Sequence, residues 1–215
     1  MTALLLLGPN TPLLFQGQEF GSSKPFYYFA DHNDDLNKLV HSGRKEFLEQ
    51  FPRLSSKEAK SYIPDPSNPM TFTRCKLDFS EKERHAHYWA LHLDLIKLRK
   101  QDPVFSRMSE LTVDGAVLNE NAFILRYFGK EHERLLLINF GPDLIYNPAP
   151  EPLLAPPAGM KWSLLWSSEA PVYGGEGIPA INIPHLKLPG HSALVLRTAV
   201  EKKRQSREED SSNGE

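Results

Sequence analysis

The fold of this chain is decided by the stretch Gly8-Pro9-Asn10-Thr11-Pro12-Leu13-Leu14-Phe15-Gln16-Gly17-Gln18-Glu19-Phe20-Gly21. Proline and glycine bracket the apolar run 13–15, which is too short for a helix and is typical of a buried parallel strand. In a barrel of alternating strands and helices, the residues that follow the C-terminal end of a strand face the mouth of the barrel. We therefore expect Glu19 to lie at such a mouth.

The same stretch, preceded by the leucines at 4–7, resembles the entry to the eighth strand in the α-amylase superfamily of glycoside hydrolases. Three further blocks are similar to the C-terminal part of the maltooligosyltrehalose trehalohydrolase family, and these are residues 25–32, 43–47 and 72–78. The resemblance extends from Met1 to about Arg197. It implies an α/β segment followed by an all-β segment, in which the last strand and helix of a TIM (β/α)8 barrel precede a C-terminal antiparallel β-sandwich.

The resemblance also implies that the catalytic carboxylates are not in this chain. Members of the superfamily carry the nucleophilic aspartate, the acid/base glutamate and the stabilising aspartate after the fourth, fifth and seventh strands. We therefore expect them upstream of Met1, expect the chain to be the last third of a larger enzyme, and expect the isolated chain to be inactive. Asp31 and Asp34 lie in a segment with the letters of the superfamily's Asn-His-Asp motif, but in another order and after the strand, so neither is expected to be catalytic.

Aromatic and polar residues gather in the loop 22–34, where four consecutive aromatic residues at 26–29 are followed by Asp31 and His32. Aromatic rings stack on the apolar faces of sugars, and the hydroxyl groups need charged or amide partners. The alternative is that some of these rings belong to the core and that the acidic residues cap the next helix. We take Glu19, Phe29, Asp31 and His32 as the candidate substrate-binding residues.

The resemblance implies a parent enzyme that hydrolyses the α-1,4 bond next to a terminal trehalose unit, by a retaining mechanism with two carboxylates. The expected partner is a maltooligosaccharide or maltooligosyltrehalose, and trehalose is the product. Two alternatives stay open: another superfamily enzyme, such as a glucan branching enzyme, or a non-catalytic glucan-binding or structural module. No cofactor and no metal are expected, because the 8 histidines are scattered and His85 and His87 lack the i, i+4 spacing of a helical metal pair.

Length and composition limit the other possibilities. With 215 residues the chain is too short for a whole barrel, and a net charge of -2 with a pI near 6.5 gives no general attraction to nucleic acid or to anionic membranes. No apolar run approaches the roughly 18 residues of a membrane span. Cys75 is the single cysteine, which excludes an intramolecular disulfide and fits a reducing compartment. We expect a cytoplasmic protein, and the sequence leaves its oligomeric state open.

Helical spacing predicts two helices in the first half of the chain. One is capped by Asp34 or Asp35, is kinked or broken at Gly43 and ends at Pro52. Prolines then predict an extended loop over 52–71. The other covers 80–101, and Ser80 with Glu83 has the pattern of a capping box.

Beyond Pro103 the period changes to that of strands, with short apolar runs at 111–118, 122–128, 134–140, 161–166 and 192–197. Residues 129–132 predict a hairpin between the second and third runs. Trp162, Trp166 and Tyr173 are interpreted as core or interface residues and not as a surface for stacking on glucan. The predicted domains are the end of the barrel at 1–103, the β-sandwich at 104–199 and a disordered tail at 200–215.

Overall fold

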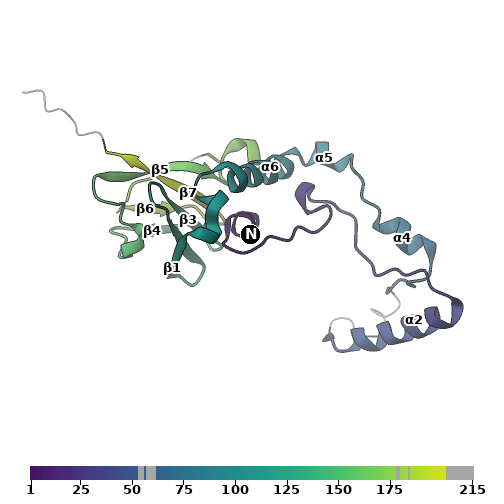
Figure 1. The fold of residues 1–215 in the computed structure, drawn as a ribbon. Coiled ribbons are helices and arrows are strands. Elements are labelled where there is room, and N and C mark those ends of the chain that lie inside the picture. The colour runs from purple at the N-terminus through teal and green to yellow at the C-terminus, as the bar shows by residue number, and fades with distance from the viewer. Residues whose placement is uncertain (53–55, 57–61, 178–179, 184, 202–215) are drawn as a thin grey trace, which may run out of the picture. The chain divides into compact units, whose positions relative to one another are not determined.

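The computed structural model describes residues 1–52, 56, 62–177, 180–183 and 185–201 (Figure 1). The chain divides into two compact units. The first unit joins Met1–Leu13 to His87–Glu215, and the second unit is Leu14–Ala86. The division into barrel and sandwich at residue 103 stays a prediction.

The first unit is built around an antiparallel sheet with the strand order β1-β2-β3-β7-β5. Its strands are β1 (Thr112–Asn119), β2 (Ala122–Phe128), β3 (Glu133–Asn139), β7 (Ala193–Val200) and β5 (Met160–Ser167). The five strands predicted beyond Pro103 are therefore confirmed. The hairpin at 129–132 is confirmed too, since Phe128 of β2 faces Glu133 of β3.

A second, two-stranded sheet pairs β4 (Leu144–Tyr146) with β6 (Leu186–Leu188), and the sequence pattern did not predict it. The apolar residues of this small sheet pack against those of the larger sheet, and together they form one core. The core includes Leu144, Leu186 and Leu188 from the small sheet and Ile124, Leu135, Leu137, Trp162, Leu194 and Leu196 from the large one. Two sheets that share one core form the predicted all-β part, and the burial of Trp162 and Trp166 confirms that they are core residues.

The N-terminal helix α1 (Thr2–Leu7) belongs to the first unit and is held by α6 (Ala86–Gln101) and the sheet. The Arg99 guanidinium donates to the carbonyl oxygens of Leu6 at 2.6 Å, Gly8 at 3.1 Å and Asn10 at 2.9 Å. The buried Tyr127 hydroxyl of β2 donates to the Leu7 carbonyl at 2.6 Å. The last carbonyl groups of a helix have no partners within it, so these donors satisfy the C-terminal end of α1.

The strand expected at 13–15 is not formed, because residues 11–15 have no regular structure. Leu13 is 84% exposed and Phe15 is 54% exposed. A parallel strand is stable only beside other strands, and the strands in the described part of the chain pair among themselves.

The second unit is mainly helical and contains η1 (Gln18–Phe20), α2 (Asp34–Glu49), α4 (Pro69–Cys75) and α5 (Glu81–Arg84). The side chain of Asn33 caps α2 by accepting from the Leu36 amide at 3.0 Å, so the expected caps Asp34 and Asp35 are wrong by one or two positions. The helix also continues through Gly43 without the expected kink. The predicted loop 52–71 ends earlier than expected, since α4 begins at Pro69.

The single helix predicted over 80–101 is interrupted at His85, whose φ of -111° and ψ of 36° end α5 before α6 begins. The capping box is also wrong. The Ser80 hydroxyl donates to Asp78 Oδ1 at 2.7 Å, and the Ser80 amide donates to the same oxygen at 3.0 Å. Asp78 therefore organises this turn, and the serine is a donor instead of a cap.

The tail predicted at 200–215 begins later than expected, because β7 extends to Val200. The rest of it, residues 202–215, lies outside the described residues.

Candidate functional site

Four exposed phenylalanine rings form a continuous row in the second unit. Phe15 contacts Phe26 with 5.0 Å between ring centroids, Phe26 contacts Phe29 at 6.1 Å, and Phe29 contacts Phe72 at 5.0 Å. All three pairs meet edge to face, the favourable geometry for aromatic rings. The exposed fractions are 54% for Phe15, 56% for Phe26, 37% for Phe29 and 46% for Phe72. We call these four residues the phenylalanine row.

Two main-chain contacts hold the loop that carries Phe26 and Phe29. The Tyr27 amide donates to the Cys75 sulfur at 3.1 Å, and the Ala30 amide donates to the Pro66 carbonyl at 3.0 Å. The Cys75 thiol is buried and donates to the Thr71 carbonyl of its own helix at 3.2 Å. The only cysteine is thus a packing residue that positions the loop.

Glu81 holds the start of the same loop. Its carboxylate accepts from the Ser22 hydroxyl at 3.1 Å, from the Ser23 amide at 3.1 Å and from the Ser23 hydroxyl at 2.5 Å. The hydrogen bonds from the Ser23 hydroxyl and amide are the main reason why the pKa of Glu81 is lowered, and Ser22 and Arg84 act in the same direction. This role could not be predicted from the sequence, since Glu81 and Ser23 lie 58 positions apart.

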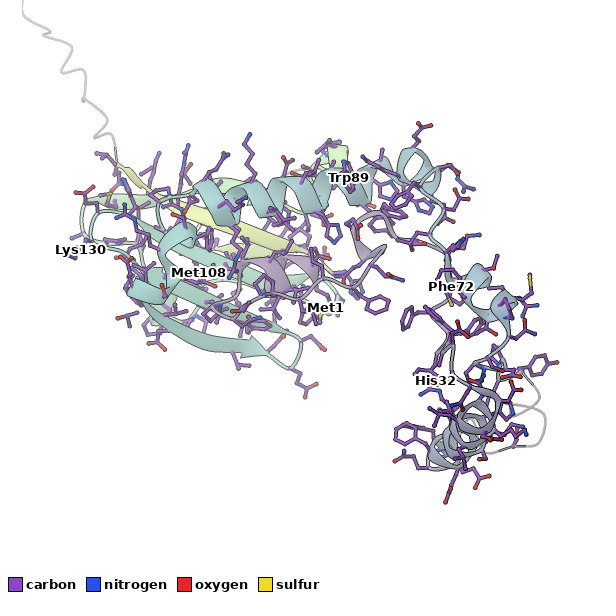
Figure 2. The ribbon with its side chains drawn as sticks, turned by 45° about the vertical axis from the view of Figure 1, so that its right-hand side comes forward. Met1, His32, Phe72, Trp89, Met108 and Lys130 are labelled. Carbon is purple, nitrogen blue, oxygen red and sulfur yellow. The ribbon has the colours of Figure 1, made fainter. Side chains whose placement is uncertain are left out.

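The candidate residues predicted from the sequence fall at two places. Glu19 is half-buried in η1, between two glycines with positive φ, Gly17 at 82° and Gly21 at 60°. Phe29 belongs to the phenylalanine row, while Asp31 and His32 are exposed just before α2. The main-chain carbonyl of His32, labelled in Figure 2, accepts from the Asn37 side chain at 2.8 Å.

The structure places Phe29, Asp31 and His32 on one short exposed segment, with Glu19 on a separate turn. Within residues 14–52 and 62–86, no hydrogen bond or ion pair joins Glu19, Asp31 and His32 to one another. Their assignment to substrate binding therefore stays a prediction.

A polar pocket of about 440 Å³ lies beside the N-terminal half of α2. It is lined by Asp34, Asn37, Lys38, His41, Asp65 and Ser67. His41 Nδ1 lies 3.5 Å from Asp65 Oδ1, and the Ser67 amide and hydroxyl hold the pKa of Asp65 below its usual value. Sequence reasoning missed His41 and Asp65, because they lie 24 positions apart in the chain and neither belongs to a recognisable motif.

Two kinds of site are absent from the part of the chain that the structure describes. There, no group of three or more His, Cys, Asp and Glu residues is arranged to hold a metal ion. None of the helices in that part combines the length and the apolar character that crossing a bilayer requires.

The comparisons with known proteins agree with the fold. Residues 112–195 match a family described as a domain of unknown function, DUF3459, which covers β1 through the first part of β7. The chain is 42% identical over 147 residues to the malto-oligosyltrehalose trehalohydrolase of Deinococcus radiodurans, over 66% of this chain and 23% of the relative. It is 30% identical over 203 residues to the protein of the same name from Mycobacterium tuberculosis, over 92% of this chain and 30% of the relative. The chain thus spans less than a third of the length of these relatives.

Among solved structures, a putative α-amylase from Salmonella typhimurium superposes with a TM-score of 0.63 at 26% identity, over 91% of this chain and 29% of that chain. Trehalulose synthase from Pseudomonas mesoacidophila gives a TM-score of 0.54 at 16% identity, over 92% of this chain and 37% of that chain, and this likeness shows the fold alone. These neighbours define the class: the chain has the architecture of the C-terminal region of α-amylase-like proteins.

The two relatives from Deinococcus radiodurans and Mycobacterium tuberculosis specify one group of proteins within this class. Within it, the chain is similar to the C-terminal region of proteins named malto-oligosyltrehalose trehalohydrolase, and the resemblance predicted from the sequence is confirmed.

Proposed function

We propose that this chain is the C-terminal part of a glycoside hydrolase that cleaves the α-1,4 bond next to a terminal trehalose unit of maltooligosyltrehalose. The observation that carries the proposal is the similarity to relatives named malto-oligosyltrehalose trehalohydrolase, which extends over 92% of the chain in one case. Because the chain spans only part of those relatives, the activity belongs to the complete protein.

The surface of the second unit supports this reading. Its buried apolar side chains in the described residues are few, chiefly Phe20 and Cys75. Large apolar residues are exposed instead, including the phenylalanine row and Leu39 and Phe47 of α2. Exposed apolar surface of this extent is typical of regions that contact other protein or a ligand. A segment that packs against the rest of a larger enzyme and borders its substrate has this property.

Each candidate residue has a role that suits its chemistry. The exposed ring of Phe29 offers an apolar face for a sugar ring, and Asp31 and His32 offer hydrogen-bonding groups for hydroxyls. Glu19 is the weaker candidate, because it is half-buried in a turn. None of the four is proposed to transfer the catalytic proton. In a retaining hydrolase that step and the nucleophilic attack belong to a pair of carboxylates, which we assign to the rest of the complete protein, and we propose that the isolated chain is inactive.

The test is Asp31→Ala in the complete protein, with kcat/KM measured on maltooligosyltrehalose. A lost hydrogen bond to a charged group costs about 1.5–3 kcal/mol, so kcat/KM should fall roughly ten- to a hundredfold. Asp35→Ala is the matched control, since Asp35 is an exposed aspartate four positions away, which forms an ion pair with Lys38 at 3.7 Å on the helix surface. Equal kcat/KM in the two variants and the wild type would show that Asp31 only supports the start of α2.

Product analysis decides the nature of the activity. Release of trehalose from maltooligosyltrehalose supports the proposal. Transfer of glucan chains to new branch points would assign a branching enzyme, and the absence of any reaction would leave a glucan-binding or structural module. A cytoplasmic location is proposed with the same function, supported by the single reduced cysteine.

A further inference from the structure

The first unit contains a pocket of about 800 Å³ that the proposed function does not use. Its walls come from the first turns of α6, from the loop after β5 and from the segments beside 142 and 190. The lining includes Tyr88, Asp143, Glu169, Tyr173, Glu176 and His191. All of these residues belong to the first unit, and none belongs to the phenylalanine row.

The backbone of this pocket is shaped by special conformations. A Cβ atom on Gly175 would lie 2.3 Å from the main-chain carbon of Glu169, so only glycine fits there. His191 has a φ of 52°, in the left-handed region that non-glycine residues seldom adopt. The Gly190 amide donates to Asp143 Oδ1 at 2.8 Å, which joins two walls of the pocket. These main-chain conformations and this hydrogen bond define the shape of the walls.

The Tyr173 side chain is held by two hydrogen bonds. Its hydroxyl donates to Asp94 Oδ2 at 2.6 Å and accepts from Trp166 Nε1 at 3.0 Å. The rings of Tyr173 and Trp166 lie 5.8 Å apart, and Trp166 is buried. A fixed aromatic ring costs little conformational entropy when a ligand packs on it, and the buried indole beside it supplies a fluorescent reporter.

The lining selects the chemistry of the ligand. It combines the rings of Tyr88 and Tyr173 with three carboxylates and two histidines and contains no lysine or arginine. An anionic ligand would therefore meet three like charges. A metal ion is not favoured either, because the described residues include no suitable group of three ligands. Neutral molecules with apolar ring faces and many hydroxyls fit both features, since rings pack on those faces and carboxylates accept from hydroxyls.

We propose that this pocket is an accessory binding site for a short segment of neutral α-glucan, separate from the site of hydrolysis. The identity of the sugar rests on the proposed function, whose substrate is a glucan. The pocket would hold a part of the glucan that is not being cleaved, and it would raise the local concentration of the substrate near the site of hydrolysis.

Maltotriose is the probe, titrated into the 215-residue chain by calorimetry and by tryptophan fluorescence. We expect saturable binding, and Tyr88→Ala should weaken it roughly tenfold because an aromatic contact is lost. Leu93→Ala is the matched control, since Leu93 lies on the same helix and, like Tyr88, is 48% exposed. Its affinity should stay within twofold of the wild type. Circular dichroism checks that both variants fold. If Tyr88→Ala does not fold, Glu176→Gln, at an exposed residue of the pocket rim, is the second variant.

Three results would overturn the proposal: no binding of maltotriose, equal loss of affinity in the Tyr88 and Leu93 variants, or tighter binding of glucose 6-phosphate than of maltotriose. Phe29→Ala serves to separate the two sites and should leave this affinity unchanged. If maltotriose binds in the pocket while the complete protein releases no trehalose, the proposed function fails and the accessory site stands.

Discussion

Arg134 of β3 and Asp102, the residue after α6, form a buried ion pair in which Nη2 and Nε of the arginine both donate to Oδ2, at 2.7 and 3.0 Å. The other carboxylate oxygen accepts from the amides of Val104 at 2.9 Å and Phe105 at 3.2 Å. One aspartate therefore neutralises a buried guanidinium and also satisfies the first amides of the following turn. Their side chains are only 5–6% exposed, so the pair is almost fully removed from water.

We expect Asp102→Ala to destabilise the first unit by about 3–5 kcal/mol, because it leaves Arg134 charged, buried and uncompensated. Chemical denaturation followed by far-UV circular dichroism measures the change. Asp114→Ala, at an exposed position of β1, is the control and should change stability by roughly 0.5 kcal/mol or less. A loss below about 1 kcal/mol for Asp102→Ala would mean that water reaches Arg134.

Tyr127→Phe should cost about 1–2 kcal/mol, since it removes the hydrogen bond to the Leu7 carbonyl and leaves that carbonyl buried. The free energy of unfolding should fall, and amide exchange in α1 should quicken. Burial also raises the pKa of Tyr127, which keeps the hydroxyl a donor at any ordinary pH. Tyr28→Phe removes a hydroxyl from a residue that is 42% exposed and should be neutral. Unchanged exchange in α1 would contradict the role given to this bond.

The hydrogen bonds that Glu81 accepts from Ser22 and Ser23 should be sensitive to acid. Its pKa is lowered in the folded state, so the carboxylate stabilises the second unit above the unfolded pKa, and this contribution is lost as the pH falls through the folded pKa. Carbon-13 NMR titration of the carboxyl group should give a midpoint below the ordinary pKa of a glutamate, about 4.3. Glu81→Gln should remove the corresponding acid-induced change around residues 22–23. A midpoint at or above the ordinary value would contradict these hydrogen bonds.

Tyr173 should ionise near pH 12, chiefly because of its burial and then because its hydroxyl donates to Asp94. Since the folded pKa is raised above the ordinary value of about 10, the neutral form contributes stability that is present below pH 10 and is lost as the pH rises through 12. Absorbance at the phenolate band checks the midpoint. Asp94→Asn should lower the pKa of Tyr173, and an unchanged midpoint in that variant would remove Asp94 as a cause.

At the start of α5, Asp78→Ala should destabilise more than Ser80→Ala. Asp78 accepts from both the amide and the hydroxyl of Ser80, and these bonds lower its pKa, whereas the Ser80 side chain makes no capping bond. Thermal unfolding of the two variants gives the order directly. If Ser80→Ala proved the more harmful, the serine would cap α5 in solution.

The strands were predictable because each has at least seven residues with a clear pattern and turn residues around it, as in Ala122–Phe128. β4 and β6 have three residues each, too few to show a period, and only their pairing with each other defines them. The strand expected at 13–15 failed for a related reason: an apolar triplet becomes a strand only where neighbours supply hydrogen bonds, and no described strand does so.

The sequence pattern at the start of a helix gave a wrong prediction where two residues compete to be the hydrogen-bond acceptor of the first turn. Ser80 and Glu83 match a capping box, yet Asp78 offers a stronger acceptor two positions earlier and takes the serine hydroxyl. Of the candidate site, the sequence indicated the aromatic loop because its four rings are consecutive. It could not indicate Phe15 and Phe72, the ends of the phenylalanine row, because they join it only through the fold.

The place of β7 in the large sheet bears on how the protein is made. β7 is the last described strand in the chain, yet it lies between β3 and β5 and pairs with both. Until the ribosome has released β7, β3 and β5 each expose an unpaired edge next to apolar side chains that are covered in the folded protein. Such edges can pair with strands of other chains. A transcript that stops before residue 193 would therefore yield an aggregating product and not a shorter working domain, and the cell would depend on chaperones to shield these edges until synthesis ends.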